Sequence, residues 1–289
     1  MSESEALAPP RAQSQEPPLA AAPHTIGSDA PFFIGMSLLG GFYIFMIVAM
    51  LVADCFYTSP GDVLDALNSP EIRYSIKLSL ISCTLTALLS VWVAAPLGYL
   101  MSRYEFPLKS VLDAILDIPI VLPPLVVGLS LLILSTTVPG QFIESIFPIR
   151  YAVPSVILAQ FMVAAAFAVR TMRQTFDQIS PRQEQVALTL GCTRSQAFFQ
   201  VVLPESRRGL VTAFTLAWAR ALGEFGPILI FSGATPFRTE VLSVSVYLQF
   251  SVGKLNAAVA VSLLMILTSI LVLVSMRAFG LKQNWKNSQ

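Results

Sequence analysis

Two charged residues, Arg220 and Glu224, lie four positions apart inside an otherwise apolar stretch from 209 to 235. Four positions make about one turn of an α-helix, so the two side chains can form an ion pair on one face. A charge within a membrane segment is costly unless it is paired or lines a polar path. The spacing therefore predicts a neutralised pair that holds helices together, which we favour, or a gate that helps an anion to pass.

Three prolines, Pro119, Pro123 and Pro124, form a second candidate gate within the apolar stretch 111 to 136. Each proline lacks a backbone donor and clashes with the preceding turn, so a regular helix cannot run through all three. We expect a kink or an unwound turn. In a membrane such backbone is tolerated only against protein or along a water-filled path, which leaves two readings open: a translocation route, or a packing kink without substrate contact.

No pattern in the sequence supports enzyme chemistry. There is no Gly-x-x-x-x-Gly-Lys-Ser/Thr run, so the chain cannot hold nucleotide phosphates in a P-loop. The single histidine, His24, lies in a polar segment, and no cluster of histidines, cysteines or carboxylates has metal-ligand spacing. We expect no catalytic residue, metal or bound cofactor in this chain, and any ATP would be used by a separate subunit.

A polar loop from residue 180 to residue 204 carries unusually complete helix signals. Ser180 is the expected N-cap, Pro181 the first helical position and Gln183 the partner in a capping box. Gly191 is expected to end this helix with a positive φ. Val186, Ala187 and Leu190 share its apolar face.

A second short helix follows in the same loop. Thr193 and Gln196 form the expected capping box, and the restriction on the residue before proline predicts a stop at Leu203, before Pro204. The side chains left to water or to a partner are Arg182, Glu184, Arg194 and Gln200. So structured a loop predicts a docking partner.

Composition places these features in a membrane protein. The 289 residues are 55% hydrophobic and 12% charged, whereas a soluble domain has about 25% charged residues. Helices of ~20 apolar residues cross ~30 Å of hydrocarbon, which predicts an all-α, polytopic protein with six transmembrane helices. The expected spans are 32–54, 76–101, 111–136, 151–172, 209–235 and 255–279.

The termini and the charges set the expected domains and orientation. We expect a disordered cytoplasmic tail at 1–30, a six-helix domain at 31–280 and a cytoplasmic tail at 281–289. If the first tail is cytoplasmic, twelve Lys and Arg residues lie on that side and five outside, which favours this orientation. Both termini and the 180–204 loop would then be cytoplasmic. The net charge of +1 gives no indication of a nucleic-acid partner.

The spacing of the loop residues resembles the EAA loop of binding-protein-dependent ABC import permeases. The residues that carry the resemblance are Glu184, Ala187, Gly191, Val201, Leu203 and Pro204. It implies that the loop, with Arg194, is a coupling helix that seats in a cytosolic ABC ATPase dimer. Val201 stands where isoleucine is usual, and Val186 where a second alanine is usual. An amphipathic interfacial hairpin without a partner is the alternative from pattern alone.

Further segments resemble molybdate and sulfate permeases: 96–103, 112–124 and 220–226. The resemblance implies a bacterial inner-membrane importer with a periplasmic substrate-binding protein, a second permease copy (homodimer favoured) and an oxyanion cargo, molybdate or tungstate first and sulfate or thiosulfate second. Pro227 departs from the usual small residue after Gly226. An autonomous secondary transporter and a membrane scaffold are the alternatives from other classes; the chain shows no convincing internal repeat of the kind that many secondary transporters have.

Overall fold

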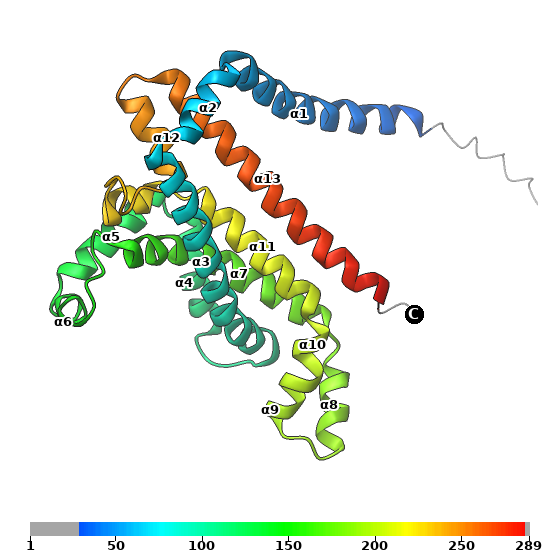
Figure 1. Ribbon diagram of the computed structural model, residues 1–289. Helices are drawn as coiled ribbons and strands as arrows, with labels where there is room; N and C mark the ends of the chain where they lie inside the picture. The colour runs from blue at the N-terminus through cyan, green and yellow to red at the C-terminus, as the bar shows by residue number, and fades with distance from the viewer. Residues whose placement is uncertain (1–28, 287–289) are drawn as a thin grey trace, which may run out of the picture. The chain divides into compact units, whose positions relative to one another are not determined.

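The computed structural model describes residues 29–286, and within that range it contains helices and no strand (Figure 1). The predicted all-α class is therefore confirmed. The predicted N-terminal tail lies almost wholly outside the described residues, as do residues 287–289. The last helix continues to Lys286, past the predicted domain boundary at 280.

The chain divides into two compact units, Met1–Met50 and Leu51–Gln289. Helix α1, Ala30–Tyr57, accounts for the described part of the first unit and runs into the second. It has no buried residue, and its mean hydropathy of 2.3 suits a membrane span. The predicted first span is thus a helix of sufficient length.

The core of the second unit consists of α3 (Pro70–Arg103), α7 (Val153–Gln178) and α11 (Arg207–Leu222). Small residues line their shared interface, and a cluster of buried side chains from all three helices surrounds Trp218. A Cβ on Gly98 would lie 2.8 Å from the backbone nitrogen of Arg173, so only glycine permits this approach of α3 to α7. Close backbone approach is how helices associate in lipid, where burial of apolar surface gives little drive.

The remaining elements surround this core. α13 (Leu255–Lys286) packs against α12 (Leu242–Ser251), α2 (Pro60–Asn68) and α11. α6 (Val138–Ile146) packs against α5 (Pro124–Thr136). The helical pieces of the polar loop are α8 (Pro181–Thr189), α9 (Arg194–Ala197), the π-helix η1 (Phe198–Val202) and α10 (Leu203–Glu205).

The third predicted span is broken, as its prolines predicted. α4 (Lys109–Val121) and α5 (Pro124–Thr136) meet at 111° across Leu122 and Pro123. Pro119 lies inside α4, which continues for two more residues. The segment is either one broken span or a re-entrant loop.

The fifth predicted span is also interrupted. α11 ends at Leu222 after 16 residues, and a second π-helix, η2, covers Ile228–Ser232. Sixteen residues rise about 24 Å, short of the ~30 Å of hydrocarbon. In the described chain four helices are long and apolar enough to span a membrane, or five if the bent pair counts as one, so the predicted count of six is not confirmed.

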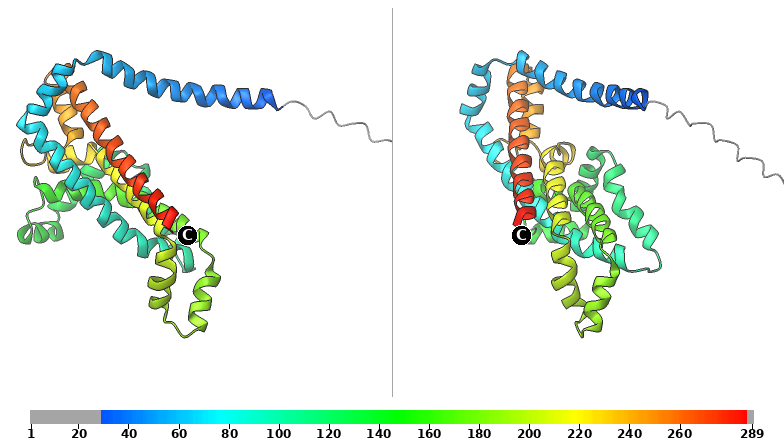
Figure 2. Two further views of the ribbon diagram at one scale, coloured as in Figure 1. Left: turned by 45° about the vertical axis from the view of Figure 1, so that its right-hand side comes forward. Right: turned by 90° about the vertical axis from the view of Figure 1, so that its right-hand side faces the viewer.

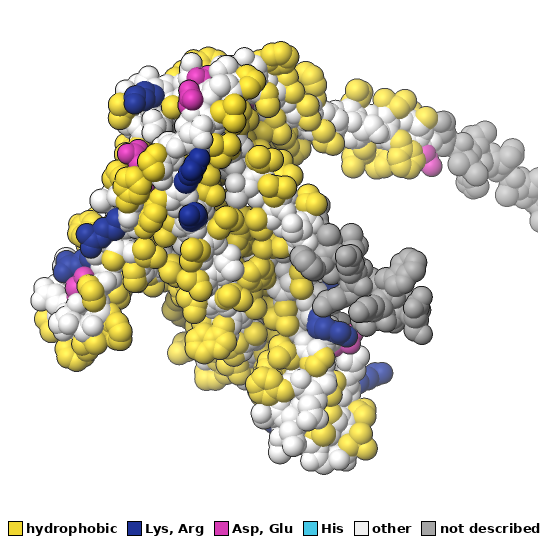
Figure 3. Space-filling model, viewed as in Figure 1, with side chains coloured by type: hydrophobic (Ala, Val, Ile, Leu, Met, Phe, Trp, Pro, Cys, Tyr) yellow, Lys and Arg dark blue, Asp and Glu magenta, His cyan; other side chains and the backbone are white. Residues whose placement is uncertain are grey.

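The helical loop and the short helices α2 and α12 lie at opposite ends of the second unit. Figures 1 and 2 show α8 and α9 projecting at one end, with α2 and α12 at the other. Between the ends, hydrophobic side chains cover most of the face drawn in Figure 3, and charged side chains are few. This distribution suits a unit whose middle lies in lipid.

Candidate functional site

The first loop helix ends as the sequence predicted. Gly191 has φ +91°, and the Gly191 and Cys192 amides donate to the carbonyls of Leu188 and Ala187, both at 3.1 Å. This pair of bonds is the Schellman motif that satisfies the last carbonyls of a helix. At the other end the Ser180 hydroxyl accepts a bond from the Arg182 amide, in place of the predicted capping box with Gln183.

The second helix starts as predicted but does not stop. The Thr193 hydroxyl accepts from the Gln196 amide and the Gln196 side chain accepts from the Thr193 amide, which completes the capping box. The predicted end at Leu203 is wrong, because the chain turns into η1 and continues through Pro204. The Leu203 amide donates to Phe198, five residues back, so the hydrogen-bond ladder has already shifted before the proline and Pro204 occupies an early position of α10.

The exposed face of the loop differs from the predicted one. Ala187 is buried, but Val186 and Leu190 are 56% and 80% exposed, and Phe199 on η1 is 61% exposed. Glu184, assigned to water or a partner, instead points inward, with a side chain 12% exposed. On α8, two of the three residues of the predicted apolar face therefore lie on the outer side of the loop. Its exposure at the projecting end of the unit is what a docking surface requires.

Both charged residues of the predicted loop site bind residues at the end of α3 or its C-cap, Tyr104. Glu184 accepts a hydrogen bond from the Tyr99 hydroxyl and pairs with Arg103, and Arg194 donates to the hydroxyl of Tyr104. That hydrogen bond to Tyr104 raises the pKa of Arg194, which keeps it a cation. Leu203 is half-buried and Pro204 exposed. Sequence periodicity could not have found these contacts, because the partners lie on a distant helix.

The predicted intramembrane pair is present. Arg220 lies 2.7 Å from the Glu224 carboxylate, whose side chain is 1% exposed. The pair forms although α11 ends between the two residues, since Gly223 keeps a nearly helical backbone. The guanidinium also lies 5.8 Å from the ring centre of Phe167 on α7. This geometry neutralises the charge and links α11 to α7, as the structural reading requires.

A buried glutamine beside this break was missed by sequence reasoning. Gln160 on α7 donates to the Ala221 carbonyl at 3.2 Å and accepts from the Thr86 hydroxyl on α3 at 3.2 Å. Its side chain joins all three core helices close to the point where α11 ends. A lone glutamine in the otherwise apolar middle of span 151–172 was the available signal.

The predicted proline gate and the pair lie on adjacent segments. Pro123 is the N-cap of α5 and Pro124 its first residue, and α5 packs against η2, which follows the break after Leu222. Pro119 lies one turn earlier, inside α4. Two interrupted backbones thus meet in the region that the sequence assigned to the membrane. At the break after α11 neighbouring side chains bond the backbone: Gln160 donates to the Ala221 carbonyl and the Ser243 hydroxyl to the Glu224 carbonyl. Irregular backbone in a membrane is tolerated where protein satisfies it in this way.

Two ion pairs tie α4 to α7. Asp113 binds Arg173, and Asp117 lies 3.6 Å from Arg170. Each of the two aspartates on α4 thus has an arginine partner on α7. The side chains are between 31% and 58% exposed, so each pair contributes little to stability.

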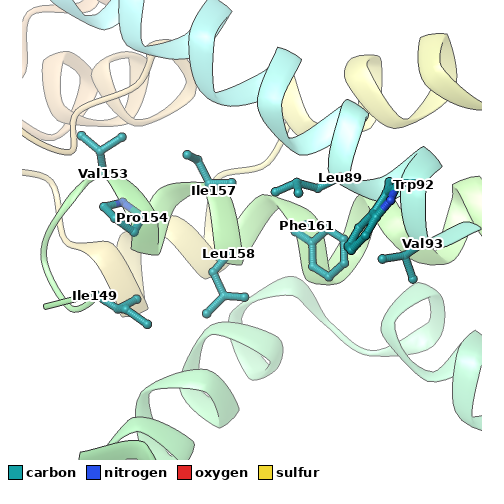
Figure 4. A pocket seen from close by; sticks show the side chains of 9 residues that line it. All are labelled: Leu89, Trp92, Val93, Ile149, Val153, Pro154, Ile157, Leu158 and Phe161. Carbon is teal, nitrogen blue, oxygen red and sulfur yellow. The ribbon is translucent and has the colours of Figure 1, made fainter. Parts of the chain in front are cut away.

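An apolar pocket of about 540 Å³ opens between α3 and α7. Figure 4 shows Trp92 and Phe161 at one end of it and Val153 and Pro154 at the other. Apart from the Trp92 indole, its lining side chains carry only carbon, so it contains no charged group to bind an anion. Within residues 29–286 no group of three or more His, Cys, Asp or Glu residues could hold a metal ion.

Comparisons with known proteins agree on one family. The family described as binding-protein-dependent transport system inner membrane component matches residues 94–283. The sulfate transport system permease protein CysT of Salmonella typhimurium is 29% identical over 246 residues, which are 84% of this chain and 89% of that protein. The molybdate/tungstate transport system permease protein WtpB of Thermococcus kodakarensis is 30% identical over 240 residues, 82% of this chain and 92% of that protein.

A solved structure shares the fold. It is a bacterial ABC transporter involved in the import of the acidic polysaccharide alginate, with a TM-score of 0.69 at 16% identity, covering 88% of this chain and 96% of that one. A second structure of a bacterial alginate ABC transporter, in complex with an alginate pentasaccharide-bound periplasmic protein, has a TM-score of 0.68 at 17% identity, covering 86% and 93%.

Proposed function

We propose that this chain, which belongs to the family of binding-protein-dependent transport system inner membrane components, is the permease subunit of an ATP-driven oxyanion importer. The observation that carries the proposal is the loop of α8, α9 and η1, which projects at one end of the unit (Figure 2). Its side chains Val186, Leu190 and Phe199 are apolar and exposed. The sequence contains no P-loop of its own. The work of ATP hydrolysis would therefore enter through this loop from a cytosolic ABC ATPase dimer.

Docking of the ATPase can be tested on the exposed apolar residues. Replacing Leu190 or Phe199, 80% and 61% exposed, with serine should reduce the amount of ATPase recovered with the permease. Burial of such a side chain contributes about 1.5–3 kcal/mol, so each change should weaken the complex at least tenfold. Val252→Ser, at a 70% exposed site on the opposite end, is the matched control. Unchanged recovery in both loop variants would contradict the docking surface.

The orientation in the membrane is a separate part of the proposal. Both termini and the loop would face the cytoplasm, and the segment from Pro236 to Asn256, which contains α12, would face a periplasmic binding protein. Exposed Ser195 and Ser251 mark the two sides. With the native cysteines replaced, Ser195→Cys should react with an impermeant maleimide only from the cytoplasmic side and Ser251→Cys only from the outside. The opposite pattern would reverse the topology.

The cargo is proposed from the relatives, which are named for sulfate and for molybdate or tungstate. We propose molybdate or tungstate as the favoured cargo and sulfate or thiosulfate as the second candidate. The cargo would be carried by a homodimer of this chain. The affinity of the associated binding protein for molybdate, tungstate and sulfate can be measured by calorimetry. Tighter binding of sulfate than of molybdate would reverse the order.

Uptake into vesicles tests the function as a whole. The reconstituted permease should accumulate oxyanion only when the ATPase, ATP and the loaded binding protein are all present. An ion gradient without ATP should drive no uptake. Uptake driven by the gradient alone would instead support an autonomous secondary transporter.

A further inference from the structure

One turn at the end of α3 holds the inner side of the loop. The Tyr99 hydroxyl donates a hydrogen bond of 2.5 Å to one carboxylate oxygen of Glu184, and Arg103 Nε lies 3.5 Å from the other oxygen. The Arg103 and Glu184 side chains are only 9% and 12% exposed. Both oxygens of Glu184 therefore have a partner within the same chain.

The same turn makes further contacts on either side of α8. An Arg103 terminal nitrogen donates to the Ile179 carbonyl, between α7 and α8, at 2.8 Å. The Tyr104 hydroxyl accepts from Arg194 on α9 at 2.9 Å. The Tyr99 ring packs edge-on against Phe198 of η1, with centroids 4.7 Å apart. We name Tyr99, Arg103 and Tyr104, with their loop partners Glu184 and Arg194, the α3 clasp.

The clasp matters because of how the chain is connected. The loop continues covalently into α7 on one side and into α11 on the other, but it reaches α3 only through side chains. α3 in turn packs along α7 and α11. Without the clasp, a force on the loop would act directly on α7 and α11. α3 would then move only through its packing against those two helices.

Glu184 is the central group of the clasp, because it accepts the Tyr99 hydrogen bond and forms an ion pair with Arg103. A carboxylate shielded from water needs partners for its charge, and a hydrogen bond to an ionised acceptor is stronger than one between neutral groups. Arg103 and Tyr99 provide these partners from one turn of α3. An exposed glutamate on α8 could serve an external partner, whereas this one is shielded by its own chain.

We propose that Glu184 is a positioning residue that fastens α8 to the end of α3, so that movement of the loop is transmitted to α3. This inference rests on the proposed function. It also separates two tasks on the loop: the outward apolar residues contact the ATPase, and Glu184 contacts the permease itself.

The test uses the complete transporter in vesicles and compares Tyr99→Phe, Glu184→Ala and the double variant. Tyr99→Phe keeps the ring contact with Phe198 and removes only the hydroxyl. Each single variant should retain the ATPase but lower oxyanion uptake per ATP hydrolysed by about tenfold, the factor expected for one lost hydrogen bond to a charged group. The double variant should be no worse than Glu184→Ala, because both changes break the same contact.

Two comparisons make the result specific. Glu184→Gln keeps an acceptor for Tyr99 but loses the charge facing Arg103, so it should lie between wild type and Glu184→Ala. Tyr57→Phe removes the hydroxyl of a tyrosine that is 53% exposed and should behave as wild type.

The outcomes that would overturn this inference differ from the one that would refute the proposed function. If Glu184→Ala loses the ATPase and Tyr99→Phe couples as wild type does, Glu184 serves the ATPase and the inference is overturned. If the double variant falls by the product of the single effects, the two residues act separately and the inference is again overturned. Wild-type uptake that needs no ATPase would instead refute the proposed function.

Discussion

The side-chain amide of Gln160 donates a hydrogen bond of 3.2 Å to the backbone carbonyl of Ala221. In an unbroken helix this carbonyl would accept from the amide of Phe225, but α11 ends at Leu222. The carbonyl instead accepts from the Glu224 amide at 3.2 Å and from Gln160. A side chain of α7 thus stabilises the interrupted end of α11.

Gln160→Leu should destabilise the protein, because it removes this bond and the acceptor for Thr86. The loss should be about 1–2 kcal/mol, or a fall in the thermal midpoint of roughly 2–8 °C, measured on the purified protein in detergent. Gln174→Leu, at an exposed position on the same helix, is the control. A midpoint equal to that of wild type would show that Gln160 does not stabilise the break.

Gly191→Val should uncouple ATP hydrolysis from transport while the protein still inserts in the membrane. A Cβ at this position meets nothing within 4 Å, so the change acts only through the backbone, whose φ is +91°. A left-handed conformation costs about 1–2 kcal/mol for a residue with a Cβ, and more for a β-branched one. Gly191→Asn should be milder, and uptake per ATP measures both. Normal coupling in the valine variant would contradict the assigned turn.

Arg220→Met should destabilise the protein strongly, because it leaves the Glu224 carboxylate, 1% exposed, without its charge partner. Breaking a buried pair costs about 3–5 kcal/mol. The double variant Arg220→Met with Glu224→Gln should recover most of the stability. Uptake then separates the two readings: retained transport supports a structural pair, whereas a stable but inactive double variant supports a gate.

Glu240 should make stability depend on pH. Burial raises the pKa of this carboxyl above its ordinary 4.5, as does the nearby charge of Glu71, whereas the hydrogen bond from Ser245 lowers it. The folded state then holds the proton more tightly than the unfolded state, so the stabilisation is complete below pH 4.5 and is lost as the pH rises through the raised value. Glu240→Gln should reduce the change in thermal midpoint between acidic and neutral pH. Glu205→Gln, at an exposed site, should leave that change as in wild type. If the thermal midpoint changes with pH equally in wild type and in Glu240→Gln, Glu240 is not the cause.

Local features of the loop were predictable because their partners are near in sequence. The caps at Ser180 and Thr193 and the turn at Gly191 depend on groups within about five positions, so a single stretch of sequence contains both members of each interaction. The helix end predicted at Leu203 is wrong because the π-helix η1, directly before it, accommodates Pro204. The helix-breaking tendency of the proline alone does not reveal such a shift in the hydrogen-bond pattern.

The sequence by itself determined a helical, apolar chain with a polar loop of two capped helices, because helix caps and hydrophobic spans are set by neighbouring residues. Only the tertiary structure decided which way the loop side chains face. Glu184 meets Tyr99 from 85 positions away, and Gln160 meets Ala221 from 61. Periodicity marks which residues share a helix face, but the packing of distant helices determines whether that face meets protein or remains open to a partner.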